Sequence, residues 1–269
     1  MRRRDFLLAL AAGTVALTGC EGAHLPSHPA RKTLVRARPL SNGLVTSPAT
    51  RPHPHATHPH RPPPRPARVL TELPGETRNI ALTIDDGVDS YVVGTLIDFV
   101  KASHIRLTFF PNGVYASWTE HAKKLRPLVE SGQVQLGNHT WSHPDLTHLH
   151  DREVAGQIQR NDQFLRDTFG VHAAPYLRPP YGFHDRRTDR IAADLGYDRI
   201  TMWYGTLGDG TPSITADQIV ASGRQWLDAG RIVIGHANQD PISHVYGQLL
   251  DIIRSRRLHM VTLADVFGH

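Results

Sequence analysis

The pattern of apolar residues along the chain changes near residue 76. From there on, short apolar runs alternate with segments whose apolar positions recur every three or four residues. The first pattern is typical of buried strands and the second of amphipathic helices. Their alternation predicts an α/β domain over residues 76–269.

The expected strands are short, and helices are expected after the first three of them. The strands are NIALTI (79–84), RLTFF (106–110), QVQLG (133–137), YLR (176–178), RITMW (199–203) and RIVIG (231–235). Thr215 and Gln218 predict a capping box for a helix that ends at Gly230. The last segment, MVTLADVF (260–267), predicts one more strand and a turn.

Residues 1–20 have the features of an export signal. The start Arg3-Arg4-Asp5-Phe6-Leu7 resembles a twin-arginine signal, and Leu17-Thr18-Gly19-Cys20 resembles a bacterial lipobox. The apolar run between them is too short to cross a bilayer comfortably. We therefore expect an exported lipoprotein, acylated at Cys20 and held at the outer face of the bacterial cytoplasmic membrane, or else a protein of the cell wall or a secreted one. An uncleaved anchor with an incidental thiol is the alternative.

Residues 21–75 have almost no apolar periodicity and hold 12 of the 20 prolines and six histidines. This Pro/His/Arg-rich composition predicts a disordered tether, with its HPHATHPH stretch either solvated or binding metal adventitiously. The basic charge of the chain, +5 overall, belongs to these first 75 residues. Residues 76–269 carry 19 Lys and Arg against 22 Asp and Glu, so we expect no nucleic-acid partner.

Ionisable residues follow five of the expected strands. They are Asp85, Asp86, His139, His143, Arg178, Asp209 and His236. In a closed parallel barrel the carboxyl ends of the strands share one mouth, where barrel enzymes perform their chemistry. The pattern therefore favours an active site at that mouth.

Two adjacent carboxylates repel each other unless a cation lies near. A metal held by Asp86, His139 and His143 supplies that cation and keeps open positions, as in catalytic zinc sites. Asp85 is then free to accept a proton. Two purely structural interpretations stay open. The aspartates can form an ordinary turn, and the histidines can be polar residues of a loop.

The remaining polar residues have candidate roles around such a metal. His236 is either a core histidine or a general acid for a leaving amine, and Asp209 either holds that imidazole or belongs to a turn. Arg178 is a partner for the free aspartate. The rigid turn RPPYG (178–182) can aim an amide N–H at an oxyanion.

Five segments, in this order, resemble the motifs of the polysaccharide deacetylase family, also called the NodB-homology or carbohydrate esterase family 4 group. They are TIDDG, HTWSH, RPPYG, WYGTLGD and IVIGHA. The resemblance implies a distorted (β/α) barrel and a divalent metal, commonly zinc or cobalt. It also implies hydrolysis of acetyl groups from N-acetylated sugars.

The resemblance also implies a role for each matching residue. Asp85 would be the general base, oriented by Arg178, and His236 the acid that protonates the amine, tuned by Asp209. The metal ligands would be Asp86, His139 and His143, and the backbone N–H of Tyr181 would help to hold the oxyanion. The chain departs from the usual motifs at Ile84, Val88, Thr206 and Gly210.

These observations together predict a metal-dependent hydrolase that removes N-acetyl groups from a cell-wall or extracellular polysaccharide. Peptidoglycan amino sugars are the expected substrate, because a membrane-tethered enzyme can reach them. Two alternatives remain, an O-acetyl polysaccharide esterase and a non-catalytic metal- or wall-binding lipoprotein.

Overall fold

The structure is a computed structural model, and it describes residues 66–269. Its strands are β1 (Arg68–Leu70), β2 (Asn79–Asp86), β3 (Leu107–Pro111), β4 (Val134–Leu136), β5 (Tyr176–Leu177), β6 (Arg199–Thr201), β7 (Gly205–Thr206), β8 (Ile232–His236) and β9 (His259–Met260). Their order is β1-β6-β5 in one sheet and β4-β3-β2-β8-β7 in the other, with β9 beside the start of β2. Within residues 66–269, every pair of these strands is parallel.

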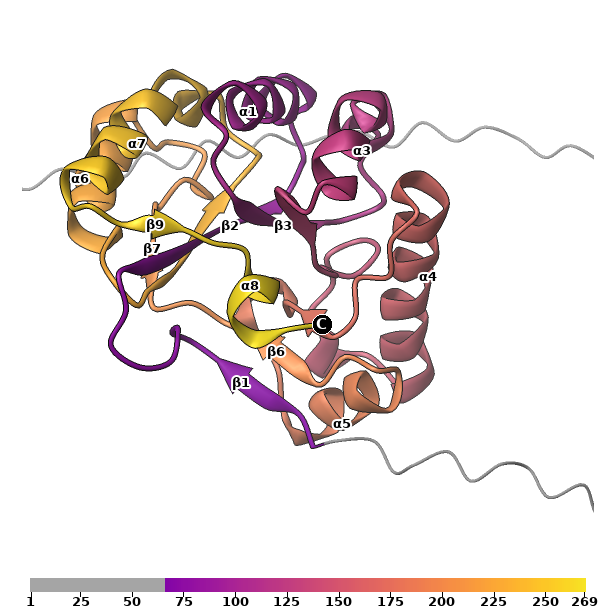
Figure 1. Cartoon of the computed structure of the whole chain (residues 1–269). Coiled ribbons are helices and arrows are strands. Elements are labelled where there is room, and N and C mark those ends of the chain that lie inside the picture. The colour runs from indigo at the N-terminus through magenta and orange to yellow at the C-terminus, as the bar shows by residue number, and fades with distance from the viewer. Residues whose placement is uncertain (1–65) are drawn as a thin grey trace, which may run out of the picture. The chain divides into compact units, whose positions relative to one another are not determined.

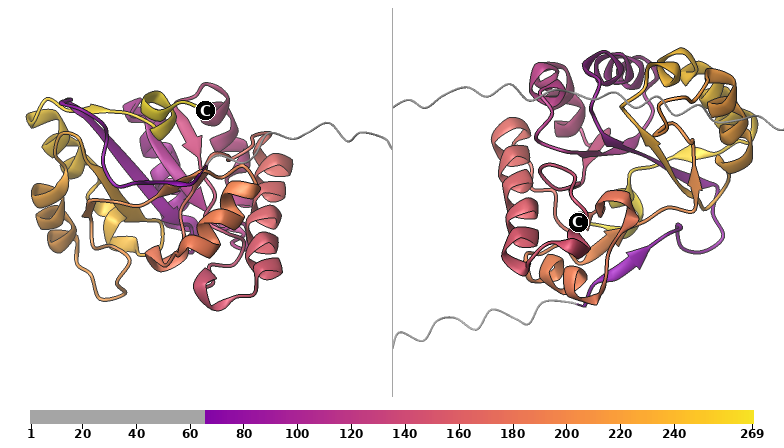
Figure 2. Two further views of the ribbon diagram at one scale, coloured as in Figure 1. Left: turned by 90° about the horizontal axis from the view of Figure 1, so that it is seen from below. Right: turned by 180° about the vertical axis from the view of Figure 1, so that it is seen from behind.

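Helices surround these strands. They are α1 (Ser90–Ser103), α2 (Ser117–Glu120), α3 (Ala122–Glu130), α4 (Asp151–Phe169), α5 (Arg186–Asp194), α6 (Ala216–Trp226), α7 (Tyr246–Ser255) and α8 (Leu263–Phe267), with 3-10 turns η1 (Leu146–His148), η2 (Pro180–Gly182) and η3 (Asp240–His244). Figure 1 shows α1, α3, α4, α5, α6 and α7 on the outside and α8 in the middle. The two further views in Figure 2 show the same arrangement of helices around the strands.

Two isolated bridges connect the two sheets. Asn138 pairs in parallel with Leu177, and Glu72 pairs in antiparallel fashion with Arg231. The parallel strands thus curve into an incomplete ring in which two bridges replace regular pairing. The expected α/β fold, a distorted barrel, is confirmed.

The core lies on both sides of the strands. A smaller cluster that includes Ala81, Phe110, Tyr176 and Ile232 lies apart from a larger one, which contains the apolar stripes of the outer helices. Consistent with this, all but the first residue of β2 is buried. A strand buried on both faces is apolar over a continuous run, as NIALTI is.

The C-terminal segment differs from the expected strand and turn. Only His259–Met260 pairs as a strand, and Leu263–Phe267 forms α8. Thr262 caps this helix in a capping box with Asp265. Amide groups at the start of α8 donate to Thr108 Oγ1 and Gln135 Oε1 at the beginnings of β3 and β4. The helix therefore closes the amino end of the barrel.

The fold also begins earlier than the boundary expected at residue 76. Residues 68–70 form β1, which pairs with β6, and Leu70 and Leu73 are buried. A strand of three residues is too short to show a period, which is why the sequence pattern missed it. The expected signal and Cys20, and the expected tether up to residue 65, lie outside the described residues. In residues 66–269, no helix is long and apolar enough to cross a membrane.

Candidate functional site

The carboxyl ends of β2, β5 and β8 and the loop after β4 enclose one open cleft. Six of the predicted site residues line it, namely Asp85, Asp86, His139, His143, Tyr181 and His236. The other two, Arg178 and Asp209, lie directly behind it and bind Asp85 and His236. The structure therefore places all eight predicted residues around a single cleft.

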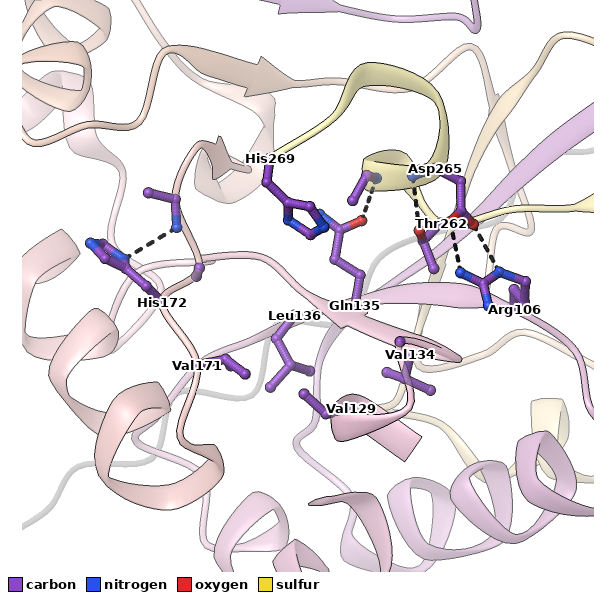
Figure 3. A pocket seen from close by; sticks show the side chains of 14 residues that line it. Arg106, Val129, Val134, Gln135, Leu136, Val171, His172, Thr262, Asp265 and His269 are labelled. Atoms are coloured by element: carbon purple, nitrogen blue, oxygen red, sulfur yellow. Dashed lines mark hydrogen bonds and ion pairs between the residues drawn. The ribbon is translucent and has the colours of Figure 1, made fainter. Parts of the chain in front are cut away.

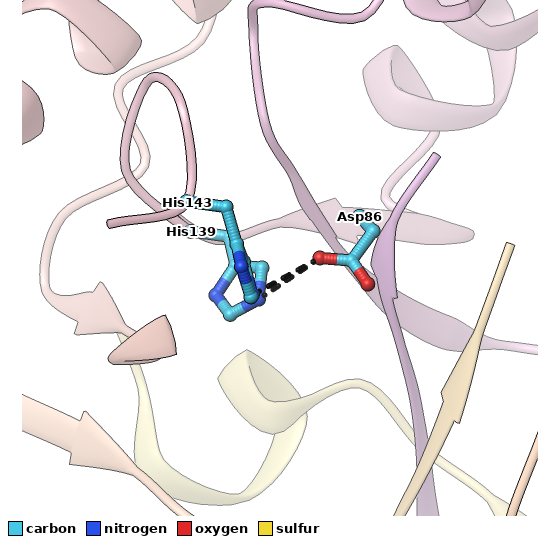
Figure 4. Close-up of side chains that lie close together, drawn as sticks. All are labelled: Asp86, His139 and His143. Carbon is cyan, nitrogen blue, oxygen red and sulfur yellow. Dashed lines mark ion pairs between the residues drawn. The ribbon is translucent and has the colours of Figure 1, made fainter. Parts of the chain in front are cut away.

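Asp86, His139 and His143 point toward one another (Figure 4). Nε2 of His139 is 3.3 Å, and Nε2 of His143 is 3.4 Å, from the same atom, Oδ1 of Asp86. One nitrogen or oxygen atom from each residue lies within 4.8 Å of the others. A divalent ion can bind to such a set and leave positions open for other ligands.

The surroundings of Asp86 fit a cation. Its Oδ1 is buried and has no hydrogen-bond partner among the described residues, although buried polar atoms are normally satisfied. Burial acts to raise the pKa of this carboxyl, but the adjacent imidazoles of His139 and His143 outweigh burial and lower the pKa. This ionised oxygen accepts no hydrogen bond from the described residues and lies next to two imidazole nitrogens. Together the three atoms form a ligand set that suits zinc or cobalt.

The two imidazoles are held differently. Nδ1 of His139 lies 2.7 Å from the carbonyl oxygen of Arg178, and since a carbonyl only accepts, Nδ1 carries a proton and Nε2 faces Asp86. Burial acts to lower the pKa of His139, yet Asp85 and Asp86 raise it overall. Burial and the neighbouring His139 lower the pKa of His143 to about 4. His143 therefore presents a neutral ring at neutral pH.

Asp85 is held by a buried arginine. The Arg178 guanidinium is 0% exposed and donates to Asp85 Oδ1 and Thr83 Oγ1, both at 2.7 Å. Its other nitrogens donate to the carbonyl oxygens of Thr201 and Met202. Oδ2 of Asp85 lies 3.5 Å from Nε2 of His139. One oxygen of Asp85 is thus fixed by Arg178, while the other faces the histidines.

On β8, the strand beside β2, Asp209 holds His236, which is paired in register with Asp85. Oδ1 of Asp209 is 2.9 Å from Nδ1 of His236, and Oδ2 accepts from the backbone N–H of the same residue at 2.8 Å. Burial acts to lower the pKa of His236, but the hydrogen bond and charge of Asp209 raise it to about 9. His236 is therefore protonated at neutral pH and can give up a proton.

The backbone is strained around this cleft. Six non-glycine residues of the described chain have a positive φ, and four of them lie here, Asp86 (69°), Thr140 (69°), His143 (59°) and Tyr181 (58°). Each such residue costs on the order of 1–3 kcal/mol and persists only where its surroundings enforce it. This concentration of strain is typical of a functional site.

Asn238 is a site residue that the sequence analysis missed. Its Nδ2 donates to Oδ2 of Asp86 at 2.6 Å, and its Oδ1 accepts from the backbone N–H of Val88. Its position two residues after His236 was the only signal in the sequence. Such a hydrogen bond orients a ligating carboxylate.

A buried amide network shapes the loop that carries the two histidines. Oδ1 of Asn138 accepts from the backbone N–H of Thr140 and from Nδ2 of Asn161 on α4. Oδ1 of Asn161 accepts from the backbone N–H of Gly113. The network fixes the loop from behind, and the sequence pattern gave no indication of it.

The two departures in the fourth motif lie along the cleft next to His236. Thr206 accepts a hydrogen bond from the backbone N–H of Gly208. A Cβ atom on Gly210 would lie 3.1 Å from Cε1 of His236. The glycine thus lets the chain pack closely against the imidazole, and the Asp209–His236 pair is retained beside it.

A second pocket lies at the amino end of the barrel, beneath α8 (Figure 3). Arg106 makes a two-point ion pair with Asp265, and Gln135 accepts from the backbone N–H of Ala264. These polar groups hold α8 against the strands. This structural role explains why polar residues line part of the pocket.

Comparison with known proteins agrees with this geometry. Residues 73–200 match the family model described as polysaccharide deacetylase. The chain is 29% identical over 198 residues to a chitin deacetylase of Arthroderma benhamiae, covering 70% of this chain and 52% of that protein. It is 27% identical over 204 residues to a peptidoglycan-N-acetylglucosamine deacetylase of Bacillus cereus, covering 72% and 70%. The chain spans about half the length of the first curated relatives that it matches.

Solved structures share the fold. A chitin deacetylase of Colletotrichum lindemuthianum superposes with a TM-score of 0.66 at 22% identity, over 74% of this chain and 91% of that one. A Bacillus anthracis protein described as a pseudoenzyme of carbohydrate esterase family 4 gives 0.65 at 16% identity, over 74% and 68%. Because enzymes and a pseudoenzyme share this fold, the fold alone does not determine whether a protein is active. Activity depends on the side chains of the site. The matching family model and the five ordered motifs show that the part of the chain from residue 73 onward belongs to the polysaccharide deacetylase family.

Proposed function

We propose that the protein is a metal-dependent hydrolase that removes acetyl groups from the amino sugars of a polysaccharide. The observation that carries this proposal is Oδ1 of Asp86, a buried oxygen that has no hydrogen-bond donor within residues 66–269 and lies within 3.4 Å of two imidazole nitrogens. Asp86, His139 and His143 would hold zinc or cobalt. A bound metal would supply a Lewis acid, which polarises an acetyl carbonyl and lowers the pKa of a water molecule.

The residues around the metal ligands divide the proton transfers between them. Asp85, fixed by Arg178, accepts a proton as the water oxygen bonds to the acetyl carbon. The N–H of Tyr181, at the strained turn, donates to the oxygen that becomes negative. His236 then gives its proton to the nitrogen as the C–N bond breaks. The products are acetate and a free amine.

We further propose that the substrate is a cell-wall polysaccharide, with peptidoglycan amino sugars favoured. The relatives named for chitin and for peptidoglycan support an N-acetylated glycan. The lipobox-like Leu17-Thr18-Gly19-Cys20 supports tethering at the outer face of the cytoplasmic membrane, where the wall is within reach. Treating whole cells with a protease would test that location, since the protein should be cut without lysis.

Acetate release tests the activity. The purified protein is incubated with N-acetylated and O-acetylated oligosaccharides, first with a chelator and then with zinc or cobalt restored. We expect acetate from the N-acetylated sugars only when metal is present. Release from the O-acetylated sugars alone would indicate an esterase. No release from either, with zinc bound, would indicate a non-catalytic metal-binding protein.

A further inference from the structure

Most of the exposed large apolar side chains follow strands at the carboxyl end of the barrel, where the cleft opens, and Val88 and Tyr181 line the cleft itself. Seven large hydrophobic residues of the described chain are exposed, and five of them follow the carboxyl ends of β2, β3 or β5. These five are Val88, Tyr91, Val114, Tyr181 and Phe183. Grouped exposed apolar side chains mark interaction surfaces more often than chance exposure does.

Two of these residues form a continuous aromatic surface. Tyr181 and Phe183 are 60% and 53% exposed, and their ring centroids lie 5.9 Å apart with a tilt of 39°. The ring of Tyr181 also contacts the ring of His143, at a centroid distance of 4.5 Å. The surface therefore begins at a candidate metal ligand and runs outward from the cleft.

The backbone beneath the two rings is rigid. Gly182 and Phe183 donate to the carbonyl oxygens of Pro179 and Pro180, and two successive residues, Tyr181 and Gly182, have a positive φ. A Cβ atom on Gly182 would lie 3.0 Å from both Met202 and Trp203, so the turn packs closely on these side chains. Rings held in advance lose little conformational freedom when a ligand covers them.

We propose that Tyr181 and Phe183 form a sugar-binding shelf that holds the residue adjacent to the one being deacetylated. This inference rests on the proposed function. A polymer whose acetylated sugar enters the cleft must continue across the rim. The C–H face of a β-linked pyranose is apolar and covers an aromatic ring while its hydroxyl groups stay in water, which suits exposed amphipathic surfaces of this kind.

The shelf predicts a dependence on chain length. The rate is measured on β-1,4-linked N-acetylglucosamine oligomers, from the monosaccharide to the hexasaccharide. We expect kcat/KM of the wild-type protein to rise with length. Phe183→Ala should lower kcat/KM about three- to tenfold on the longer oligomers, mainly through KM, because it removes one aromatic contact with the polymer. The monosaccharide should be unaffected.

Two variants provide controls. Phe183→Trp keeps an aromatic ring and should keep the preference for long oligomers. Tyr204→Ala removes an aromatic residue that is 47% exposed and lies beside the first residue of β8, at the other end of the barrel. It should leave the length dependence unchanged. An equal loss for Phe183→Ala on every oligomer, or no loss on any, would overturn the shelf.

Direct binding separates the shelf from the proposed activity. The hexasaccharide is titrated into the wild-type protein and into Phe183→Ala, and the dissociation constants are compared by calorimetry. Weaker binding by Phe183→Ala supports the shelf even if no acetate is released, in which case only the proposed activity fails. Equal dissociation constants would contradict the shelf even in an active deacetylase.

Discussion

Nδ2 of Asn238 lies 2.6 Å from Oδ2 of Asp86, and this hydrogen bond leaves only Oδ1 of the carboxylate facing the two histidines. The amide thus determines which oxygen is offered to a metal and in which direction. Because the two residues are 152 positions apart in the chain, their pairing exists only in the fold.

Asn238→Ala should weaken metal binding. Removal of a hydrogen bond that orients a ligand commonly costs 10- to 100-fold in metal affinity. The zinc dissociation constant, measured by competition with a chelating dye, checks this. A merely structural role, through the bond that Asn238 accepts from Val88, would instead lower the melting temperature of the metal-free protein and leave the dissociation constant unchanged.

Zinc should stabilise the protein through the Asp86 site. A ligand present at 100 times its dissociation constant adds about 2.7 kcal/mol to the free energy of unfolding, and thermal unfolding with and without zinc measures this. His143→Ala removes one ligand from a partly exposed position and should abolish most of the shift. An undiminished shift would place the metal elsewhere, with the histidines of residues 21–75 as the first alternative.

Arg178→Met should destabilise the fold by about 3–5 kcal/mol, because it leaves the buried Asp85 without its positive partner. The double variant Asp85→Asn with Arg178→Met should recover part of this loss, since the uncompensated charge is gone. Urea unfolding of the two single variants and the double variant gives the coupling energy. Strictly additive effects would show that the two residues are not a coupled pair.

The activity should fall at alkaline pH as His236 loses its proton. The pKa of His236 is raised to about 9 in the folded protein, so a general acid at this position is charged below about 9 and is lost above it. Asp209→Asn removes the charge that raises this pKa, and the alkaline limb of kcat should move toward the ordinary value of 6.5. A pH–rate profile of both proteins checks the shift.

The same pair affects stability with a definite sign. Because the folded pKa of His236 lies above its ordinary value of 6.5, the pair stabilises the fold fully below that value, and the contribution is lost as the pH rises through about 9. The difference in unfolding free energy between the wild type and Asp209→Asn should therefore shrink over this range. A constant difference would argue that the pair is held by the backbone contact alone.

The sequence predicted which residues lie around the cleft more completely than it predicted the helices and strands of the fold. Polar residues at strand ends were informative because parallel strands bring those ends together, whatever the helices between them do. Helix α7 was missed although Tyr246, Leu249, Leu250 and Ile253 follow the helical period and are buried. That signal was present in the sequence and could have been used.

Other features of the fold could not be predicted from local sequence patterns. A strand as short as β1 is defined by its partner, β6, and not by its own residues. The buried amides of Asn138 and Asn161 look like ordinary polar residues until the fold brings them together. Long-range hydrogen bonds of this kind determine where the histidines point, which is why residue types could be predicted and orientations could not.

Arg178 connects residues of β2 and β6 in the interior through Thr83, Asp85 and the carbonyl of Thr201. The group that would orient the base is therefore also a cross-brace of the barrel. If a descendant of this chain no longer needed hydrolytic activity, losing Asp85 or Arg178 alone would still destabilise its fold. Evolutionary loss of activity in this chain should begin with substitutions at His236 or at the metal ligands, and the aspartate–arginine pair should be retained longest or disappear in a single paired exchange.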